Sequence, residues 1–322
     1  MNCYPATEET IRRAADVLSH GGIVAFPTET VYGLGADAFN PIAVARIFEA
    51  KRRPHFDPLI VHIAGFDEID AVARDIPGAA RLLADAFWPG PLTLVLPKRD
   101  RVPDIVTAGL PTVAVRMPAN DVALSLIRLL GRPVAAPSAN PFGYLSPTCA
   151  RHVAEQLGNE VDMILDGGQC AVGVESTIVK IDDGSAELLR PGGLPAEEIE
   201  RIIGMLQIAE DPAACIESPG QLKSHYAPKT PVRIVGGIDE VPRAGGIGVL
   251  AFTGTPRHTD FSAVEILSPS GDLREAAARL FLCLHNLDSR GVSVIYAESV
   301  PETGLGLAIM NRLRRAAARA DL

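Results

Sequence analysis

The interpretation of this chain rests on the segment PTETVYGLG at residues 27–35 and the segment KRRPHFDP at residues 51–58. The apolar run before the first segment predicts a buried strand that ends at Pro27. The polar, glycine-containing residues after it predict a loop, and Asn40 predicts the cap of a helix whose first residue is Pro41. That helix ends in the cationic cluster. The pattern brings hydroxyl groups and positive charge together, which favours a site for an anionic ligand.

The basic cluster at residues 51–55 also has a purely structural interpretation. Cations at the C-terminal end of a helix interact favourably with its dipole, so Lys51 alone is as consistent with helix stabilisation as with binding. Pro54 and Pro58, however, stiffen a segment that presents three cations beside a hydroxyl-rich loop. This combination favours anion binding.

Length and composition are those of an ordinary soluble protein. The chain has 322 residues, enough for two domains, and 47% of them are hydrophobic and 21% charged. We expect a cytoplasmic location and no membrane partner, because no apolar run is long enough to span a membrane and residues 1–18 lack a signal-peptide core. A net charge of -9 restricts RNA binding to a weak interaction with a local patch. The five cysteines form no Cys-x-x-Cys pair, which argues against a zinc module or disulfide framework.

The order of predicted elements divides the chain into two domains. In residues 1–205, strands and helices interleave without strict alternation, which predicts an α/β domain with a twisted, mixed sheet. Residues 206–230 are rich in turn residues and predict a linker. Residues 231–322 return to regular periodicity and predict a smaller, Rossmann-like α/β domain. Its last helix carries basic residues that we expect to face solvent: Arg312, Arg314, Arg315 and Arg319.

The chain does not match the common nucleotide-binding motifs that use glycine-rich loops. It has no Walker-type Gly-x-x-x-x-Gly-Lys-Ser/Thr segment, and the glycines of residues 33–35 do not join a strand directly to a helix, as a dinucleotide fingerprint does. What remains is a dispersed set of hydroxyls and cations near predicted strand ends. Each alone is more simply a turn former or a surface arginine. Together they favour phosphoryl-type chemistry, in which positioning and charge neutralisation dominate: Arg116, Ser138, Asn140, Ser146, Ser176 and Arg190.

Six segments resemble, in order, motifs of the YrdC-like domain of threonylcarbamoyl-AMP synthases. They are the segments at residues 27–34, 51–59, 89–93, 115–116, 137–140 and 175–177, and the resemblance extends over residues 7–204. Ser218-Pro219-Gly220, His225-Tyr226-Ala227-Pro228 and the trailing domain resemble the longer, two-domain form. The resemblance implies an L-threonylcarbamoyladenylate synthase. Such an enzyme forms threonylcarbamoyl-AMP and pyrophosphate from L-threonine, bicarbonate and ATP, for threonylcarbamoyladenosine modification of tRNA by a downstream transferase.

The same resemblance implies roles for individual residues. The catalytic pair is Lys51 and Arg53. Mg²⁺ is expected to bind with ATP, without dedicated protein ligands. The expected ATP contacts are Arg53, Asp57, Thr112, Ser138, Asn140, Ser146, Arg190 and Tyr226, and the expected threonine contacts are Thr30, His62, Arg116 and Ser176.

Two departures from the family pattern concern the substrates. Asp57 stands where an asparagine often contacts ATP, and a carboxylate there would repel phosphate unless it faces the ribose or the metal. Ala136 stands where some members have a hydroxyl that contacts threonine, which leaves that contact to backbone or water. A further hypothesis concerns residues 206–230. We expect this linker to fold over the first-domain pocket as a lid, with Tyr226 contacting the nucleotide.

Two rival functions stay open from the sequence. The positive concave surface of this family could bind double-stranded RNA, as a translation or ribosome-assembly factor without catalytic activity. The overall acidity and the dispersed hydroxyls favour a small ligand instead. The second rival is an enzyme for a different carbamoyl or amino-acid substrate, since threonine differs from serine by one methyl group.

Overall fold

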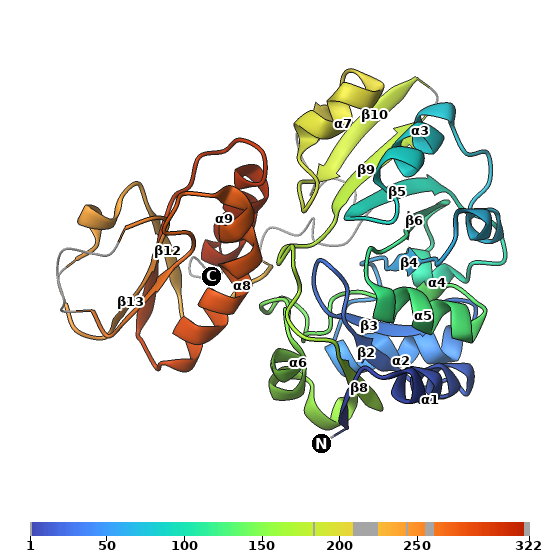
Figure 1. Cartoon of the computed structure of the whole chain (residues 1–322), viewed down its shortest axis with the longest axis horizontal. Helices are drawn as coiled ribbons and strands as arrows, with labels where there is room; N and C mark the ends of the chain where they lie inside the picture. The colour runs from blue at the N-terminus through green and yellow to red at the C-terminus, as the bar shows by residue number, and fades with distance from the viewer. Residues whose placement is uncertain (1, 183, 209–224, 243, 255–260, 319–322) are drawn as a thin grey trace.

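The computed structural model describes residues 2–182, 184–208, 225–242, 244–254 and 261–318, which form two α/β domains (Figure 1). The first contains a large mixed sheet and the second a small parallel one. Among the described residues, no helix is both long and apolar enough to cross a lipid bilayer. The predicted fold class, a twisted mixed-sheet domain followed by a smaller α/β domain, is confirmed.

The first sheet has both parallel and antiparallel neighbours, because its chain connections include hairpins as well as longer, helix-containing connections. In order across the sheet, its strands are β1 (Cys3–Pro5), β8 (Met163–Asp166), β2 (Val24–Phe26), β3 (Gly33–Asp37), β7 (Val134–Ala135), β4 (Ile60–His62), β6 (Thr112–Arg116), β5 (Leu92–Pro97), β9 (Thr177–Asp182), β10 (Ser185–Arg190) and β11 (Gln207–Ile208). The strand β11 lies within the predicted linker and lengthens this sheet. The rest of that linker up to residue 224 lies outside the described residues.

Helices cover both faces of the first sheet. Successive residues of a strand point to opposite faces, so Val24 and Phe26 pack into one apolar cluster and Ala25 into another. Helices α1 and α5 supply the first cluster, and α2, α3 and α7 supply the second. The helices of this domain are α1 (Glu8–Ser19), α2 (Pro41–Lys51), α3 (Gly78–Phe87), α4 (Asp104–Thr107), α5 (Asp121–Leu130), α6 (Ala150–Gln156) and α7 (Ala196–Ile203).

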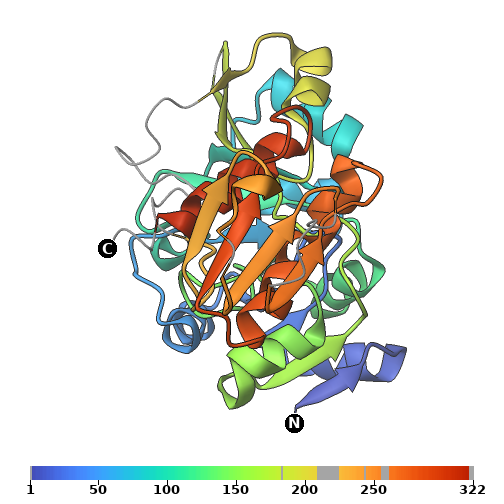
Figure 2. The same ribbon diagram turned by 90° about the vertical axis from the view of Figure 1, so that its left-hand side faces the viewer.

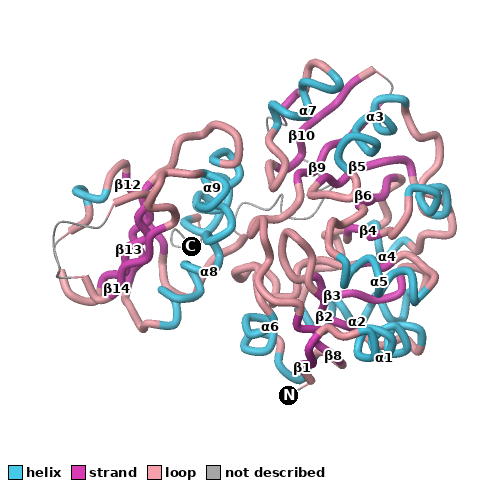
Figure 3. The backbone as a smooth tube through the Cα atoms, in the orientation of Figure 1, coloured by secondary structure: helices cyan, strands magenta, loops and turns pink. Residues whose placement is uncertain are grey.

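The second domain places two helices between its sheet and the first domain, as Figures 1 and 2 show. Its strands are all parallel and lie in the order β12 (Val232–Val235), β15 (Val294–Glu298), β13 (Ile247–Ala251) and β14 (Ala263–Ile266). The helices are α8 (Leu273–Ser289) and α9 (Gly306–Ala317). Many loops of the first domain lie on the side that faces these helices (Figure 3).

Polar side chains cap several helix starts, as the sequence predicts for Asn40. Asn40, Asn120 and Asp272 each accept hydrogen bonds from two backbone amides of the first turn. Thr148 does not cap the helix after it, although threonine is a common capping residue. Helix α6 begins one residue later, after Cys149, and the Thr148 amide donates instead to Nδ1 of His152 at 3.3 Å.

The predicted polar loop at residues 27–35 is in part a strand, which corrects the sequence interpretation. Gly33–Asp37 form β3, which pairs antiparallel with β2 and β7. A β-carbon on Gly35 would lie 2.7 Å from both the Phe26 ring and a Val134 methyl group. Glycine is therefore required for close packing rather than for a turn.

The two domains are packed through a shared apolar cluster. Val31, Leu145 and Val174 of the first domain join Leu280 and Phe281 of α8 in it. Gly173 lets the backbones approach, because a β-carbon there would lie 2.5 Å from Ala277 O and from the Ala278 Cα atom. Its φ of +75° is in addition a left-handed conformation that other residues rarely adopt.

We predict that Gly173→Ala destabilises the protein more than Gly109→Ala. Both glycines have positive φ, of +75° and +78°, so the left-handed backbone costs each variant about 1–2 kcal/mol. A β-carbon at Gly109 meets no atom within 4 Å, whereas one at Gly173 meets α8. Urea unfolding measures the free energy of each variant. Equal losses would show that the close approach at Gly173 does not support domain packing.

Candidate functional site

A cavity opens where the hairpin before β3 meets the ends of β4, β6 and β7 and the start of β9. Its wall contains four cationic or imidazole side chains of the first domain and the His225–Tyr226 segment. The lining residues are Thr28, Thr30, Val31, Gly33, Arg53, Ile60, His62, Arg116, Ala136, Pro137, Ser138, Glu175, Ser176, Arg190, His225 and Tyr226. The structure thus brings together eight of the predicted site residues: Thr30, Arg53, His62, Arg116, Ser138, Ser176, Arg190 and Tyr226.

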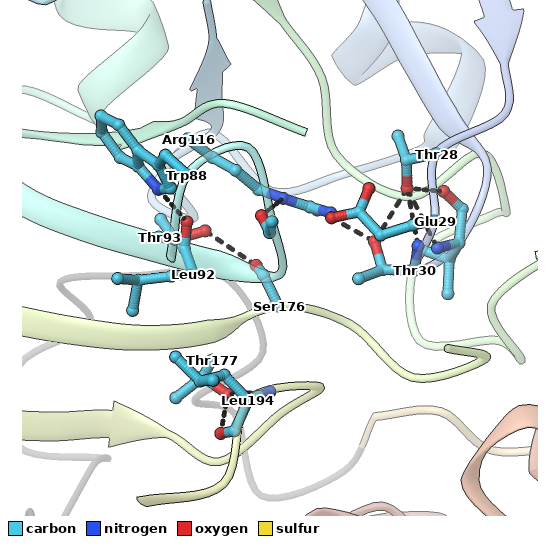
Figure 4. A network of polar contacts seen from close by, with 12 residues as sticks. Thr28, Glu29, Thr30, Trp88, Leu92, Thr93, Arg116, Ser176, Thr177 and Leu194 are labelled. Atoms are coloured by element: carbon cyan, nitrogen blue, oxygen red, sulfur yellow. Dashed lines mark hydrogen bonds and ion pairs between the residues drawn. The ribbon is translucent and has the colours of Figure 1, made fainter. Parts of the chain in front are cut away.

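Arg116 is held rigidly at the end of β6 (Figure 4). Its Nη1 donates to Thr30 Oγ1 at 2.9 Å, its Nη2 lies 2.6 Å from Glu29 Oε1, and its Nε donates to Gly90 O at 3.2 Å. The hydroxyl groups of Thr28 and Thr30 are 2.8 Å apart. The guanidinium is buried and oriented before any ligand arrives. It suits a carboxylate that binds through two parallel hydrogen bonds.

Ser176 and Arg190 form the neighbouring wall. The hydroxyl groups of Ser176 and Thr93 are 2.7 Å apart, and Arg190 Nη2 donates to Ser176 O at 2.9 Å. Burial lowers the pKa of Arg190, but a guanidinium group is so strong a base that the side chain stays cationic at neutral pH. Gly192 packs against the backbone of Glu175 and Ser176 so closely that a β-carbon would overlap it. This packing fixes the segment that presents both residues.

His62 lies beside Arg116 as a neutral imidazole. Its strand β4 pairs with β6, where Arg116 is its register partner, and its ring meets the edge of Phe26 at 6.3 Å. Burial, and then the charge of Arg116, lower the pKa of His62 to about 3. A neutral imidazole both donates and accepts a hydrogen bond, so His62 suits a hydroxyl or carboxylate ligand without adding charge.

The predicted catalytic pair differs in its exposure to the cavity. Lys51 does not line it. Its Nζ donates to the carbonyl oxygens of Ser138, at 2.6 Å, and of Asn140, and so holds the loop that contains them. The pKa of Lys51 is well below its ordinary value because the group is buried and Arg53 lies nearby. The Asn140 amide in turn donates to Tyr144 O at 2.9 Å. Lys51 and Asn140 therefore shape the wall that Ser138 presents.

Arg53 lines the cavity with Asp57 behind it. Its Nη2 lies 2.9 Å from Asp57 Oδ1 and donates to Pro58 O at 2.8 Å. Burial raises the pKa of Asp57, and the charges of Arg53, Lys51 and Arg190 oppose that rise. The carboxylate does not line the cavity. Its position beside Arg53 explains how an acidic residue is accommodated where an asparagine is usual.

Two other predicted ATP contacts do not line the cavity. Thr112 lies at the opposite end of β6 from Arg116, opposite Pro97. Ser146 is buried behind the wall and donates to Glu175. The roles predicted for Thr112, Asp57 and Asn140 therefore depend on contacts that the cavity itself does not provide.

Arg312 lies behind the cavity wall, in contact with the lining residues Glu175 and Tyr226, and the sequence interpretation missed it. The sequence pattern predicts that it faces solvent, but its side chain is 0% exposed and its Nε lies 2.8 Å from Glu175 Oε2. Helical periodicity cannot show that another domain covers this face of α9. Glu29 and Glu175 lie inside the motifs named above, yet nothing in the sequence indicates that each balances a buried arginine.

The described residues contain no cluster of three or more His, Cys, Asp or Glu side chains suited to a metal ion. Glu175 of the cavity wall is already paired with Arg312, and Asp57 with Arg53. Both carboxylates are therefore engaged with arginines of the protein itself.

Comparisons with known proteins agree with this geometry. A family model described as "Telomere recombination" matches residues 16–192, and one described as "Threonylcarbamoyl-AMP synthase, C-terminal domain" matches residues 194–318. The chain belongs to the threonylcarbamoyl-AMP synthase family. The resemblance inferred from the six motifs and from the trailing domain is confirmed, and both parts of the chain are those of the two-domain form.

Relatives match nearly the whole chain. A threonylcarbamoyl-AMP synthase of Pyrococcus abyssi is 49% identical over 96% of this chain and 94% of its own length. One of Bacillus subtilis is 45% identical over 95% of this chain and 92% of its own. The crystal structure of P. abyssi Sua5 complexed with L-threonine has a TM-score of 0.90 and 46% identity, and covers 98% of this chain and 96% of that one. As a member of this family, the chain is an enzyme.

We predict that His62 makes the stability of the protein pH-dependent. Its pKa is about 3 when folded and 6.5 ordinarily, so in this interval the unfolded chain binds a proton that the folded chain does not. Stability is therefore present above pH 6.5 and lost as pH falls towards 3. His62→Gln should reduce the slope of unfolding free energy against pH by about 1.4 kcal/mol per pH unit. Urea unfolding between pH 4 and 7 tests this, and parallel profiles for variant and wild type would contradict it.

Proposed function

We propose that this chain is an L-threonylcarbamoyladenylate synthase, a nucleotidyltransferase that forms threonylcarbamoyl-AMP and pyrophosphate from L-threonine, bicarbonate and ATP. The observation that supports this most is that three buried arginines, Arg53, Arg116 and Arg190, line one cavity. We assign the part around Arg116 and its neighbouring hydroxyl groups to threonine, the threonine end, and the part around Arg53 and Arg190 to ATP, the ATP end. The family membership and the similarity to the P. abyssi protein complexed with L-threonine support the same function.

The threonine end is formed by Thr30, His62, Arg116 and Ser176. In the proposal, Arg116 binds the amino-acid carboxylate, and the hydroxyls and the neutral imidazole bind the polar groups around it. Ala136 contributes no hydroxyl to this wall. The contact that some relatives make there is left to backbone or water.

The ATP end uses charge rather than a covalent nucleophile. The amine of threonine and bicarbonate form a carbamate with loss of water. A carbamate oxygen then attacks the α-phosphorus, an O–P bond forms, and the bond to pyrophosphate breaks. Arg53 and Arg190 are proposed to balance the phosphate charge at this step, while Lys51 holds the Ser138 loop.

We propose that Mg²⁺ enters with ATP and is held mainly by its phosphates. When bound, the ion supplies charge neutralisation to the leaving pyrophosphate. The remaining proposals follow from the reaction: a cytoplasmic location, and a transferase that passes the threonylcarbamoyl group to tRNA.

The cavity favours this reaction over binding of double-stranded RNA. Arg53, Arg116 and Arg190 are 6%, 3% and 3% exposed, so their guanidinium groups face a small enclosed ligand rather than a duplex backbone. Incubation of the purified protein with ATP, bicarbonate and threonine, without RNA, should yield threonylcarbamoyl-AMP by mass spectrometry. ATP turnover with serine but not threonine would favour a different amino-acid substrate, and no turnover would contradict the proposal.

We predict that replacing Arg116 and replacing Arg53 weaken the binding of different substrates. Arg116→Ala should weaken threonine binding by roughly tenfold to a thousandfold, because a charge-assisted, two-point contact contributes about 1.5–4 kcal/mol. Arg53→Ala should mainly weaken ATP binding. Arg53→Ala alone would leave the buried Asp57 carboxylate unpaired and could destabilise the fold. The double variant Arg53→Ala/Asp57→Asn removes both charges and is the preferred variant for this test.

Calorimetric titration of each ligand against each variant makes the comparison. Arg46→Ala is the control, since Arg46 forms a half-exposed ion pair with Asp162 on the surface. The assignment of Arg116 would be wrong if its variant bound threonine normally and lost ATP to the same extent as the Arg53 variant.

A further inference from the structure

One side chain of the second domain, that of Arg312, contacts several residues at and behind the wall of the cavity. Arg312 lies on α9, and its buried guanidinium contacts three groups of the first domain and the segment between domains. Its Nε lies 2.8 Å from Glu175 Oε2, and its Nη1 donates to Pro191 O at 2.6 Å. The guanidinium also lies over the Tyr226 ring, 5.0 Å from its centroid. A buried arginine with these contacts fixes the position of what it touches.

Glu175 connects Arg312 to other residues in and behind the cavity wall. One carboxylate oxygen meets Arg312 and the other accepts a hydrogen bond from Ser146. Its backbone oxygen accepts from Gly193 at 2.9 Å, and Ser176 beside it accepts from Arg190. The carboxylate therefore connects Arg312 to residues proposed to contact ATP.

The charge on Glu175 also depends on Arg312. Burial would raise the pKa of Glu175, but the charges of Arg312 and Arg190 and the Ser146 hydrogen bond bring it below its usual value. Glu175 is thus an anion between two cations. Without Arg312, its attraction to Arg190 would be uncompensated, and Arg190 would be less available to phosphate.

Tyr226 is held from the same side. Besides the Arg312 guanidinium, its ring meets Phe281 of α8 at 5.8 Å and His225 at 4.1 Å. The ring is 1% exposed and lines the cavity. By contrast, among the described residues the polar contacts that fix Arg116 come from the first domain, from Glu29, Thr30 and Gly90.

We propose that Arg312 is a positioning residue for the ATP end of the site. It holds both Glu175 and Tyr226 in position and balances the negative charge of Glu175. Arg190 can then interact with the phosphate groups of ATP. Through this residue the second domain controls ATP use without touching threonine. The inference rests on the proposed function and adds to it a role for the second domain.

Four single variants test the proposal. Arg312→Met removes the charge at similar length, Arg312→Lys restores a charge without the fork, and Glu175→Gln removes the anion. Arg314→Met is the matched control, because Arg314 lies on the same helix and pairs with Glu302, but its side chain is 52% exposed. The measurements are threonine binding by calorimetry, KM for ATP, kcat for threonylcarbamoyl-AMP formation and thermal midpoint.

Arg312→Met should raise KM for ATP at least tenfold or lower kcat to that extent, while its threonine Kd stays within twofold of wild type. Arg312→Lys should recover part of the loss. Adding Glu175→Gln to Arg312→Met should also recover part, since no unpaired carboxylate then competes for Arg190. Arg314→Met should match wild type in every measurement.

Other results would contradict either the role of Arg312 or the proposed function. Normal ATP kinetics in Arg312→Met would overturn the inference, as would equal losses of threonine and ATP binding, which indicate a merely structural role. If Arg312→Met does not fold, Arg312→Lys and Glu175→Gln decide, and normal ATP kinetics in both would overturn it. A wild-type protein that binds threonine and ATP but forms no threonylcarbamoyl-AMP would contradict the proposed function instead.

Discussion

The structure depends on the balance of buried positive charge around one cavity. Lys51, Arg53, Arg116, Arg190 and Arg312 are each at most 6% exposed. Burying an unpaired cation reduces the free energy of unfolding by roughly several kcal/mol. Each of these side chains therefore needs acidic or carbonyl partners from the protein itself. These partners are Glu29, Asp57 and Glu175 and the backbone oxygens of residues 58, 90, 138, 140, 176 and 191.

These partners come from segments far apart in sequence, and this explains why the fold and the site form together. The hairpin before β3 supplies Glu29, the loop after α2 supplies Asp57, and the loop before β9 supplies Glu175. Each must reach its cation for the core to close. The resulting groups are oriented before substrate binds, so little reorganisation remains to be done when negative charge develops on phosphate.

Local features of the fold could be predicted from sequence, and non-local ones could not. Asn40, Asn120 and Asp272 cap helices through bonds to amides two and three residues away, which a sequence pattern contains in full. The sequence predicts a loop in place of the strand β3, because its glycines suggest a turn. At Gly35 the true reason is the close approach of Phe26 and Val134, and Val134 lies about a hundred residues further along the chain.

The same limit applies to the site. The family resemblance selected eight residues that line one cavity. It could not identify Arg312, whose helix has the basic pattern of a solvent-exposed surface. An arginine on such a helix becomes part of the site only when another domain covers it, and here Gly173 permits that contact. Since Arg312 contacts both Glu175 and Tyr226, the geometry of the ATP end depends on how the two domains pack.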